Sequence, residues 1–268
     1  METVIRSVLR VILTIRRSSG VFRSLAMYYG IPFRGRRLRR FYRRFVGPGS
    51  LFFDIGANVG NRTLAAKRIG ARVISIEPQP HLAALLRQLF RKSDGVTVVE
   101  VAVGAQSGTV DLILNEKHPT LATTRADWIE SVQRSERFRA ERWDGSIPVQ
   151  QTTLDSLVDR FGVPDFVKID VEGNEEGVLA GLSRPLPALS FEFIPALPAQ
   201  STRCIEMLSQ LDHYRFNYSL VERMELVSHR WLGAGEMIDI LESLPRDGPS
   251  GDVYAVRTMS FSDSPSFA

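Results

Sequence analysis

Residues 51–60 (LFFDIGANVG) place an apolar run, an acid and two glycines in close succession. The apolar run has the character of a strand covered on both faces, with Asp54 near its carboxyl end. Gly56 and Gly60 lack a Cβ atom, so the backbone can turn tightly there and approach a ligand closely. Residues 61–70 follow with apolar or small side chains at helical spacing and a final glycine. The stretch predicts a strand, a ligand-holding turn and a helix.

The spacing of this turn indicates which ligand it suits. A dinucleotide site needs G-x-G-x-x-G, whose middle glycine and helix N-terminus receive a pyrophosphate. Here the pattern is D-x-G-x-x-x-G, with Ala57 and Asn58 where closely spaced glycines would stand. An acid leading into the loop favours a cationic ligand, and S-adenosylmethionine carries both a sulfonium and an ammonium group. An ordinary strand-turn-helix that binds nothing is the competing interpretation.

A second acid supports an adenosine ligand. Residues 71–77 (ARVISIE) predict another buried strand that ends in Glu77, and Pro78 and Pro80 lead into a helix over 81–91. A carboxylate about twenty residues after a glycine turn is placed to accept both hydroxyls of a ribose. NAD-binding folds and methyltransferases share this feature, and a surface acid that caps the next helix would look the same in sequence.

Length and composition favour one globular domain with a short attachment. With 268 residues, 44% of them hydrophobic, the chain can bury one large core. Cys204 is the single cysteine, which excludes an intrachain disulfide and agrees with a reducing, cytoplasmic location. The four histidines form no zinc-binding pattern, and no apolar stretch reaches membrane-spanning length. Arg6 and Arg10 interrupt the opening segment, which argues against a secretory signal peptide.

Charge is distributed unevenly along the chain. Residues 1–50 contain twelve arginines and one acid, Glu2, for a net charge of +11, whereas the remainder has 22 basic and 29 acidic residues and a net charge of −7. We expect residues 1–46 to form a basic helical segment, because apolar residues and arginines between 4 and 17 fall on different helical faces. The segment could pack on the main domain, which is the simplest reading, or lie on the inner face of an anionic membrane. A third alternative is nucleic acid, since aromatic residues interleave with the arginines up to residue 45, although no RNP, zinc-finger or helix-turn-helix signature accompanies them.

The middle of the chain alternates predicted strands and helices, which is typical of a parallel sheet with helices on both faces. Residues 115–146 break this rhythm, because they are polar, charged and only weakly periodic. An insertion of this length in an α/β domain is more often functional or mobile than part of the scaffold. Strands are predicted over 96–103, 108–114, 147–153 and 165–170, with a helix over 154–161.

The last of these strands runs into VKIDVEGNE at residues 167–175, where four charged side chains gather at the edge where such a sheet binds its ligands: Lys168, Asp170, Glu172 and Glu175. Together with DIGANVG and the strand-ending Glu77, this stretch makes the chain resemble the FkbM-type family of S-adenosylmethionine-dependent methyltransferases. The resemblance runs from about residue 47 to residue 257 and takes in GPGSLFFDIGANVGN, VISIEPQP, VAVG, TTLDSL, FVKIDVEGNEEGVLAGL, SFEF and GDVYAVR.

The resemblance implies a class I methyltransferase fold, an α/β, Rossmann-like, seven-stranded sheet that is mostly parallel with an antiparallel last strand and helices on both faces. The methyltransferase domain is expected over residues 47–258, followed by a disordered tail over 259–268. Family members typically methylate hydroxyl groups, often on sugars or polyketide-like natural products. Carried over by position, the residues that bind S-adenosylmethionine are Asp54, Gly56, Asn58, Gly60, Asn61, Glu77, Val101, Ala102 and Asp170.

Methyl transfer to an alcohol requires that the acceptor oxygen be held in line with the methyl carbon and that the hydroxyl lose a proton. Asp170 and Glu172 are the candidate bases, with Glu192 and His118 as weaker candidates. Structural alternatives exist: Lys168 and Glu172 could pair at the strand end, and His118 suits a solvated loop. A divalent metal could assist, but no ligand pattern indicates one.

Three functions remain open at this point. The first is O-methylation of a hydroxyl on a sugar, glycan, glycolipid or natural product. The second is nucleic-acid methylation through the basic N-terminus, although DVEG stands where amino-methylating enzymes carry [DN]-P-P-[YFW]. The third is a non-catalytic adaptor, which would have no need of intact glycines and acids. The acceptor pocket is expected to come from residues 115–146 and 194–200, with the N-terminal helix as a third candidate contributor.

Overall fold

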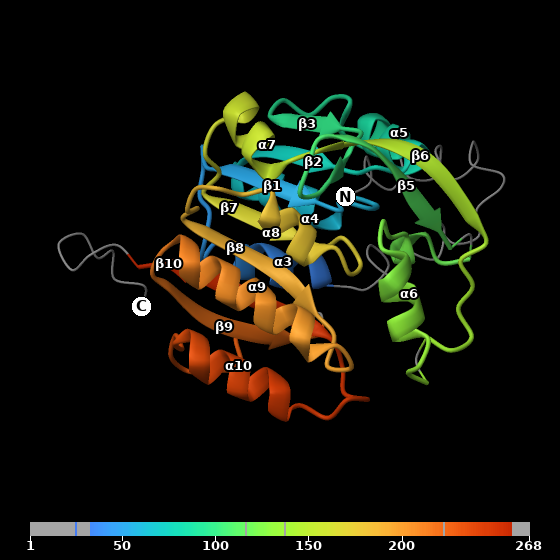
Figure 1. Cartoon of the computed structure of the whole chain (residues 1–268). Coiled ribbons are helices and arrows are strands. Elements are labelled where there is room, and N and C mark those ends of the chain that lie inside the picture. The colour runs from blue at the N-terminus through green and yellow to red at the C-terminus, as the bar shows by residue number, and fades with distance from the viewer. Residues whose placement is uncertain (1–24, 26–32, 116, 137, 222, 259–268) are drawn as a thin grey trace.

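Seven strands form one sheet in the order β3-β2-β1-β7-β8-β10-β9 (Figure 1). The structure, a computed structural model, describes residues 25, 33–115, 117–136, 138–221 and 223–258. Five of the seven strands run parallel as neighbours, and β10 is antiparallel to both β8 and β9. The expected mostly parallel sheet with an antiparallel last strand is confirmed. The strands are β1 (Leu51–Ile55), β2 (Arg72–Ile76), β3 (Val96–Val99), β7 (Phe166–Ile169), β8 (Ala188–Phe193), β9 (Tyr214–Leu220) and β10 (Gly251–Arg257).

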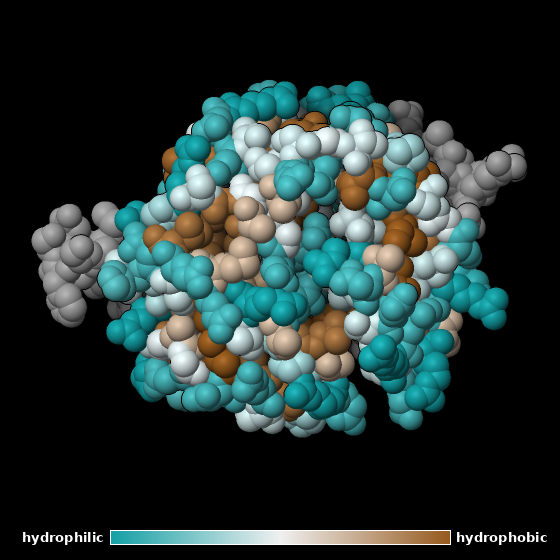
Figure 2. Space-filling model, viewed as in Figure 1, coloured by the Kyte–Doolittle hydropathy of each residue, from teal (hydrophilic) through white to brown (hydrophobic). Residues whose placement is uncertain are grey.

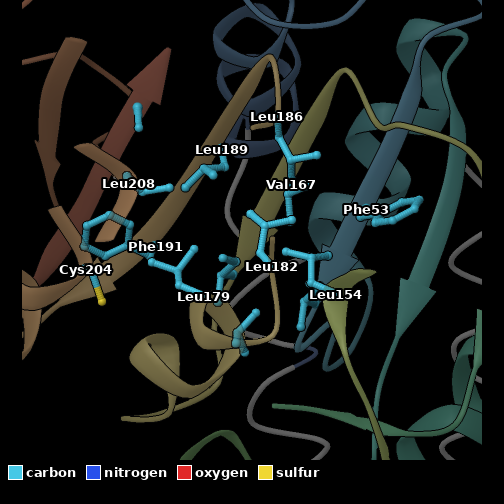
Figure 3. Packing of buried hydrophobic residues seen from close by; sticks show 14 of the residues in the cluster. Phe53, Leu154, Val167, Leu179, Leu182, Leu186, Leu189, Phe191, Cys204 and Leu208 are labelled. Atoms are coloured by element: carbon cyan, nitrogen blue, oxygen red, sulfur yellow. The ribbon is translucent and has the colours of Figure 1, made fainter. Parts of the chain in front are cut away.

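Helices cover both faces of this sheet, as Figure 1 shows. On one face, α7 (Leu154–Phe161), α8 (Glu175–Ala180), α9 (Pro198–Leu211) and α10 (Ala234–Ser243) contribute to the largest hydrophobic cluster. On the other face lie α3 (Arg34–Tyr42), α4 (Asn61–Ile69) and α5 (Pro80–Phe90). Figure 3 shows part of the first cluster, in which side chains from β7 and β8 meet those from α9 and from the segment around α8: Val167, Leu189, Phe191, Leu179, Leu182, Cys204 and Leu208.

Both faces of the central strand β7 are buried, and its one charged side chain lies on the α3 face. In β7, Val167 and Ile169 belong to the cluster under α8 and α9, whereas Phe166 belongs to the cluster under α3. Lys168 alternates with Val167 and therefore points to the α3 face, fully buried. A buried lysine needs a charged partner, so this face of the sheet must hold carboxylates near its carboxyl edge.

Three of the expected strands contribute to a separate three-stranded sheet of order β4-β6-β5: the end of 96–103, then 108–114 and 147–153. The strand expected over 96–103 is divided, because β3 pairs with β2 whereas β4 (Ala102–Val103) pairs with β6 (Gly145–Thr152). β5 (Gly108–Leu114) then pairs antiparallel with β6. Which strands pair depends on contacts between segments far apart in the chain, and the periodicity within a single strand does not reveal them.

The described part of the basic N-terminal segment packs on the main domain. Leu38, Phe41 and Tyr42 of α3 are buried against the sheet, and the Tyr42 ring meets that of Phe52 edge-on at 5.2 Å between centroids. The amphipathic pattern expected between residues 4 and 17, and the tail expected over 259–268, lie outside the described residues. Among the helices that are described, none is long and apolar enough to cross a membrane.

The insertion over 115–146 contains structure of its own. A 3-10 helix, η1 (Pro119–Leu121), precedes the short helix α6 (Ala126–Val132), and Trp128, Val132 and Phe138 form a small hydrophobic cluster there. Figure 2 shows that α6 and its surroundings stand as a largely hydrophilic lobe, separated by a notch from the lower part of the main body. The insertion thus borders the carboxyl edge of the sheet, where β1, β7 and β8 end (Figure 1).

Candidate active site

A cavity lies where β1, β2 and β7 end, with about 520 Å³ of empty space that is partly open to solvent. The cavity includes the turn after β1, the end of β2, β4 and the turn after β7, so the strand ends expected to gather ligands do come together. Seven of the residues expected from sequence line it, namely Gly56, Asn58, Glu77, Val101, Ala102, Asp170 and Glu172. The insertion over 115–146, which was expected to contribute to the acceptor pocket, supplies a further wall through Pro119, Thr120, Ala122, Thr123 and Thr124.

Gly56 fixes the floor of this cavity. Its backbone φ is +80°, and its N–H donates to the Ile76 carbonyl at 2.9 Å. A Cβ atom at this position would lie 1.8 Å from the carbonyl oxygen of Asp170. Only glycine can therefore bring the turn after β1 against the end of β7, and this close approach joins the two stretches that the sequence marked as most informative.

Glu77 forms the second polar element of the cavity. Its carboxylate accepts hydrogen bonds from the backbone N–H groups of Asn58, at 2.8 Å, and Gln79, at 3.0 Å. Asn58 makes its contact from a left-handed conformation, with φ of +49°. Burial raises the pKa of Glu77 to about 7 despite these hydrogen bonds. The carboxylate keeps lone pairs toward the cavity, which would accept hydrogen bonds from a ribose.

Three of the expected cofactor-binding residues lie outside the cavity. The Asp54 carboxylate is buried beneath it, where Oδ2 accepts a 2.5 Å hydrogen bond from Thr63 and Oδ1 has no hydrogen-bond partner in the part of the chain that the structure describes. Asn61 is buried at the start of α4. A Cβ atom on Gly60 would come within 2.6 Å of Leu86, so that glycine lets α4 pack on α5.

A row of charged side chains crosses the sheet on its α3 face. Lys168 on β7 donates to Asp252 Oδ1 on β10 at 2.9 Å and to its neighbour's carbonyl, Ile169 O, at 2.9 Å. Its ammonium also lies 3.3 Å from Asp170 Oδ2, which in turn lies 3.4 Å from Arg62 on α4. Burial acts to lower the pKa of Lys168, but the two carboxylates outweigh it and raise that pKa. The ion pair expected as an alternative thus forms between Lys168 and aspartates.

Three of the four expected catalytic side chains meet at the carboxyl edge. Ligand atoms of Asp170, Glu172 and Glu192 lie within 4.8 Å of one another and could hold a metal ion. Burial acts to raise the pKa of Asp170, but Lys168 and Arg62 bring it below its ordinary value. For Glu192, burial and the neighbouring Asp170 carboxylate raise the pKa well above the ordinary value. Two adjacent carboxylates therefore have opposite pKa shifts, which is how acid and base roles are separated in enzymes.

Glu175 organises the turn between β7 and α8, a role that sequence reasoning did not assign. Its Oε1 accepts from the N–H groups of Val171, at 3.2 Å, and Gly173, at 3.3 Å, and its side chain is buried. Burial raises the pKa of Glu175 to about 7. The turn places Glu172 in a left-handed conformation with φ of +51°, so β7 ends at Ile169. An acid in the first turn of a helix was visible in sequence, but its contacts were not.

The insertion touches this turn directly. A Cβ atom on Gly173 would lie 2.2 Å from the Trp128 ring, so the indole packs against the glycine backbone. Gln79 Nε2 donates to the Pro119 carbonyl at 2.9 Å and ties the insertion to the loop after β2. His118 does not line the cavity; its Nδ1 lies 3.0 Å from Glu141 Oε1. The fourth catalytic candidate is thus apart from the other three.

The order of the main sheet, its antiparallel last strand and a cavity at the carboxyl ends of β1 and β2 define the class I methyltransferase fold. The chain belongs to the methyltransferase FkbM domain family, which matches residues 54–243.

Relatives with known names match about half of the chain. The 2-O-methyltransferase NoeI of Sinorhizobium fredii is 29% identical over 155 residues, which cover 54% of this chain and 62% of that protein. The hexuronic acid methyltransferase AglP of Haloferax volcanii is 27% identical over 146 residues, 54% of each chain. A solved structure, precorrin-6y C5,15-methyltransferase from Geobacter metallireducens, aligns over 84% of this chain and 86% of its own at 14% identity, with a TM-score of 0.45.

Proposed function

We propose that this chain is an S-adenosylmethionine-dependent O-methyltransferase that methylates a hydroxyl group of a sugar. Membership of the FkbM family supports the cofactor and the reaction class. The names of the two relatives support the acceptor, since one is a 2-O-methyltransferase and the other acts on hexuronic acid, which is a sugar acid. The observation that carries the proposal is the meeting of Asp170, Glu172 and Glu192 beside the cavity that holds Gly56 and Glu77.

The residues around the cavity fit S-adenosylmethionine. The approach of the Gly56 backbone to Asp170 leaves no room for a side chain and forms a tight cradle for a ligand. Glu77 would hold the ribose hydroxyls, and Val101 and Ala102 would meet the adenine. Asp54 would add negative potential beneath the cationic methionine end, because it is buried close below the turn and its Oδ1 accepts no hydrogen bond from the residues that the structure describes. When bound, the cofactor supplies an electrophilic methyl group on a sulfonium.

Glu192 is the residue we propose as proton acceptor. An alcohol oxygen becomes a better nucleophile as its proton passes to a base, and a base with a raised pKa accepts that proton more readily. Asp170, which the sequence favoured, is paired with Lys168 and Arg62, and its lowered pKa makes it the weaker base. We assign Asp170 the role of orienting the acceptor through its remaining lone pairs, with Glu172 beside it.

The acceptor would enter between the insertion and the carboxyl edge. Threonines 120, 123 and 124 on the cavity wall offer hydroxyl groups that can hydrogen-bond to a sugar. We further propose that the sugar is presented at the inner face of a membrane, as on a glycolipid, because the N-terminal part of the chain is strongly basic. Lys168 and Arg62 already neutralise Asp170, so the proposed reaction uses no metal.

The test is transfer of a deuterated methyl group from labelled S-adenosylmethionine to material extracted from cells that lack the gene. After acid hydrolysis, mass spectrometry is expected to find the label on a monosaccharide hydroxyl. Label recovered on nucleosides or on protein would refute the assignment of a sugar acceptor.

The assignment of Glu192 as the base is tested by comparing two variants. Glu192→Gln is expected to lower kcat by roughly 10²–10⁴-fold, the usual contribution of a general base, while the Kd for the cofactor changes less than a few-fold. Asp170→Asn serves as the matched variant at the neighbouring strand end, and it should raise KM for the acceptor. A Glu192→Gln enzyme with the kcat of the unmodified protein would eliminate Glu192 as the base.

A further inference from the structure

Helix α3 has two faces of opposite character. Leu38, Phe41 and Tyr42 are buried against the sheet. The opposite face presents exposed arginines at 36, 37, 40, 43 and 44, the last two just beyond the helix end. No Asp or Glu occurs between residues 33 and 50, so the basic face is uninterrupted along the chain.

Most of this positive charge is not neutralised within the described residues. Arg37 lies 3.5 Å from Glu225 and donates to the Arg223 carbonyl at 2.7 Å. No carboxylate within the parts of the chain that the structure describes pairs with Arg36, Arg40, Arg43 or Arg44. The neighbouring positive charges also affect Arg39. Burial is the largest cause that lowers the pKa of its guanidinium, followed by the charges of Arg68, Arg43 and Arg36. Bringing like charges together costs free energy that an anionic partner would recover.

The placement of the aromatic residues in and just after α3 favours lipid over nucleic acid, the two kinds of polyanion that the sequence left open. Binding of single-stranded nucleic acid combines basic residues with exposed aromatic rings on which bases stack. Here Phe41 and Tyr42 are buried, and the Phe45 ring stacks on Tyr254 at 5.6 Å between centroids. The aromatic residues within and just after the helix are therefore used inside the domain.

The exposed aromatic residue near this face suits a lipid surface. Phe33 stands at the start of α3 with 68% of its surface exposed, next to the Arg36 guanidinium at 5.5 Å from the ring centroid. Helices that lie at a bilayer surface combine basic residues at headgroup level with an aromatic or aliphatic side chain that inserts. In sequence, the residues before α3 add five more arginines, at 6, 10, 16, 17 and 23, against the single acid Glu2.

We propose that the exposed arginine face of α3, with Phe33 at its start, docks the protein on an anionic lipid surface. The arginines would contact lipid phosphates, and the buried face of the helix would hold the methyltransferase domain against the bilayer. Docking does not depend on the methyl-transfer chemistry, so its failure would leave the proposed reaction in place and remove only the membrane setting of the acceptor.

The experiment is flotation of the full-length protein with vesicles of phosphatidylcholine alone or of phosphatidylcholine mixed with phosphatidylglycerol. The protein should bind the mixed vesicles and be released as salt is raised. Each arginine near an anionic leaflet contributes roughly five-fold to partition. The quadruple variant R36Q/R40Q/R43Q/R44Q is therefore expected to lose roughly 25-fold if two of the arginines reach the lipid, and roughly 600-fold if all four do.

Two further variants separate docking from net charge and from misfolding. R91Q/R134Q/R139Q/R142Q removes the same charge from exposed positions on other elements and should change partition far less. R36K/R40K/R43K/R44K keeps the charge and should retain binding, with circular dichroism and thermal unfolding as the check on folding. Equal partition of the α3 and control glutamine variants would overturn the proposal. Binding of wild-type protein to single-stranded RNA but not to the mixed vesicles would overturn it as well.

Discussion

Replacing Lys168 by methionine is expected to destabilise the protein more than almost any other single change at the site. The side chain is fully buried, and its ammonium lies 2.9 Å from Asp252 Oδ1 and 3.3 Å from Asp170 Oδ2. At an effective dielectric constant of about 20, each of these contacts corresponds to roughly 5–6 kcal/mol of attraction. Desolvation of the three charges offsets much of it, but methionine would leave two carboxylates buried without their cation.

The expected loss is about 3–5 kcal/mol in the free energy of unfolding, the usual result of breaking a buried ion pair from one side. For a domain of this size, roughly 2–4 °C of Tm accompany each kcal/mol, so the Tm should fall by roughly 6–20 °C. Urea unfolding followed by circular dichroism measures the change, with an unaltered m-value as the sign that only stability has changed.

The double variant Lys168→Met/Asp252→Asn tests the cause of this loss. If the unpaired Asp252 carboxylate is responsible, the double variant should be more stable than Lys168→Met alone, because a neutral amide is easier to bury. Asp212→Asn on the Arg257 pair is a matched control, since that contact lies at the surface and its loss should change the free energy of unfolding far less. A Lys168→Met protein within 1 kcal/mol of wild type, or a double variant as unstable as the sum of both changes, would contradict the electrostatic explanation.

Three further predictions concern the cofactor and the metal. Gly56→Ala should abolish measurable binding of S-adenosylhomocysteine in calorimetry, because the added Cβ would meet the Asp170 carbonyl at 1.8 Å and the backbone φ is +80°; binding within ten-fold of wild type would show that the turn can shift. Glu77 has a pKa of about 7 in the folded protein against an ordinary value of 4.5, so the ligand-free fold binds the extra proton and its stability should fall as pH rises between these values. Ribose hydroxyls donate to the ionised carboxylate, so the affinity for the cofactor should instead rise with pH up to about pH 7, and binding below that pH should release a proton. An affinity that does not depend on pH, or that Glu77→Gln retains in full, would speak against a ribose contact. Methyl transfer should persist after dialysis against EDTA, because Lys168 and Arg62 already neutralise Asp170; loss of activity restored by Mg²⁺ would assign the three carboxylates to a metal instead.

The local sequence pattern was enough to predict the strands, turns and helix starts that depend only on neighbouring residues. The run LFFDI predicted β1, the glycine turn predicted the start of α4, and VKIDVEG predicted the strand and turn that bear Asp170. Those features follow from residue-by-residue preferences such as the need for glycine at positive φ. Ordered motifs at matching intervals then identified the family, which the match over residues 54–243 confirms.

The contacts between segments far apart in the chain could not be predicted from the sequence. The expected strand over 96–103 splits between two sheets, and Asp54, Gly60 and Asn61 turn out to be buried behind the cavity. Lys168 finds its partner 84 residues away on β10, in a contact that no local pattern encodes.

The sequence by itself determined the fold family, the cofactor class and the carboxylates available for chemistry, because buried strands, glycine turns and acids at strand ends are written in consecutive residues. Only the tertiary structure decided which carboxylate keeps a low pKa and which a raised one, since that depends on where Lys168 and Arg62 lie relative to Asp170 and Glu192. The same reason applies to α3. Because the helix packs against the sheet, its aromatic residues lie in the core and its arginines lie at the surface.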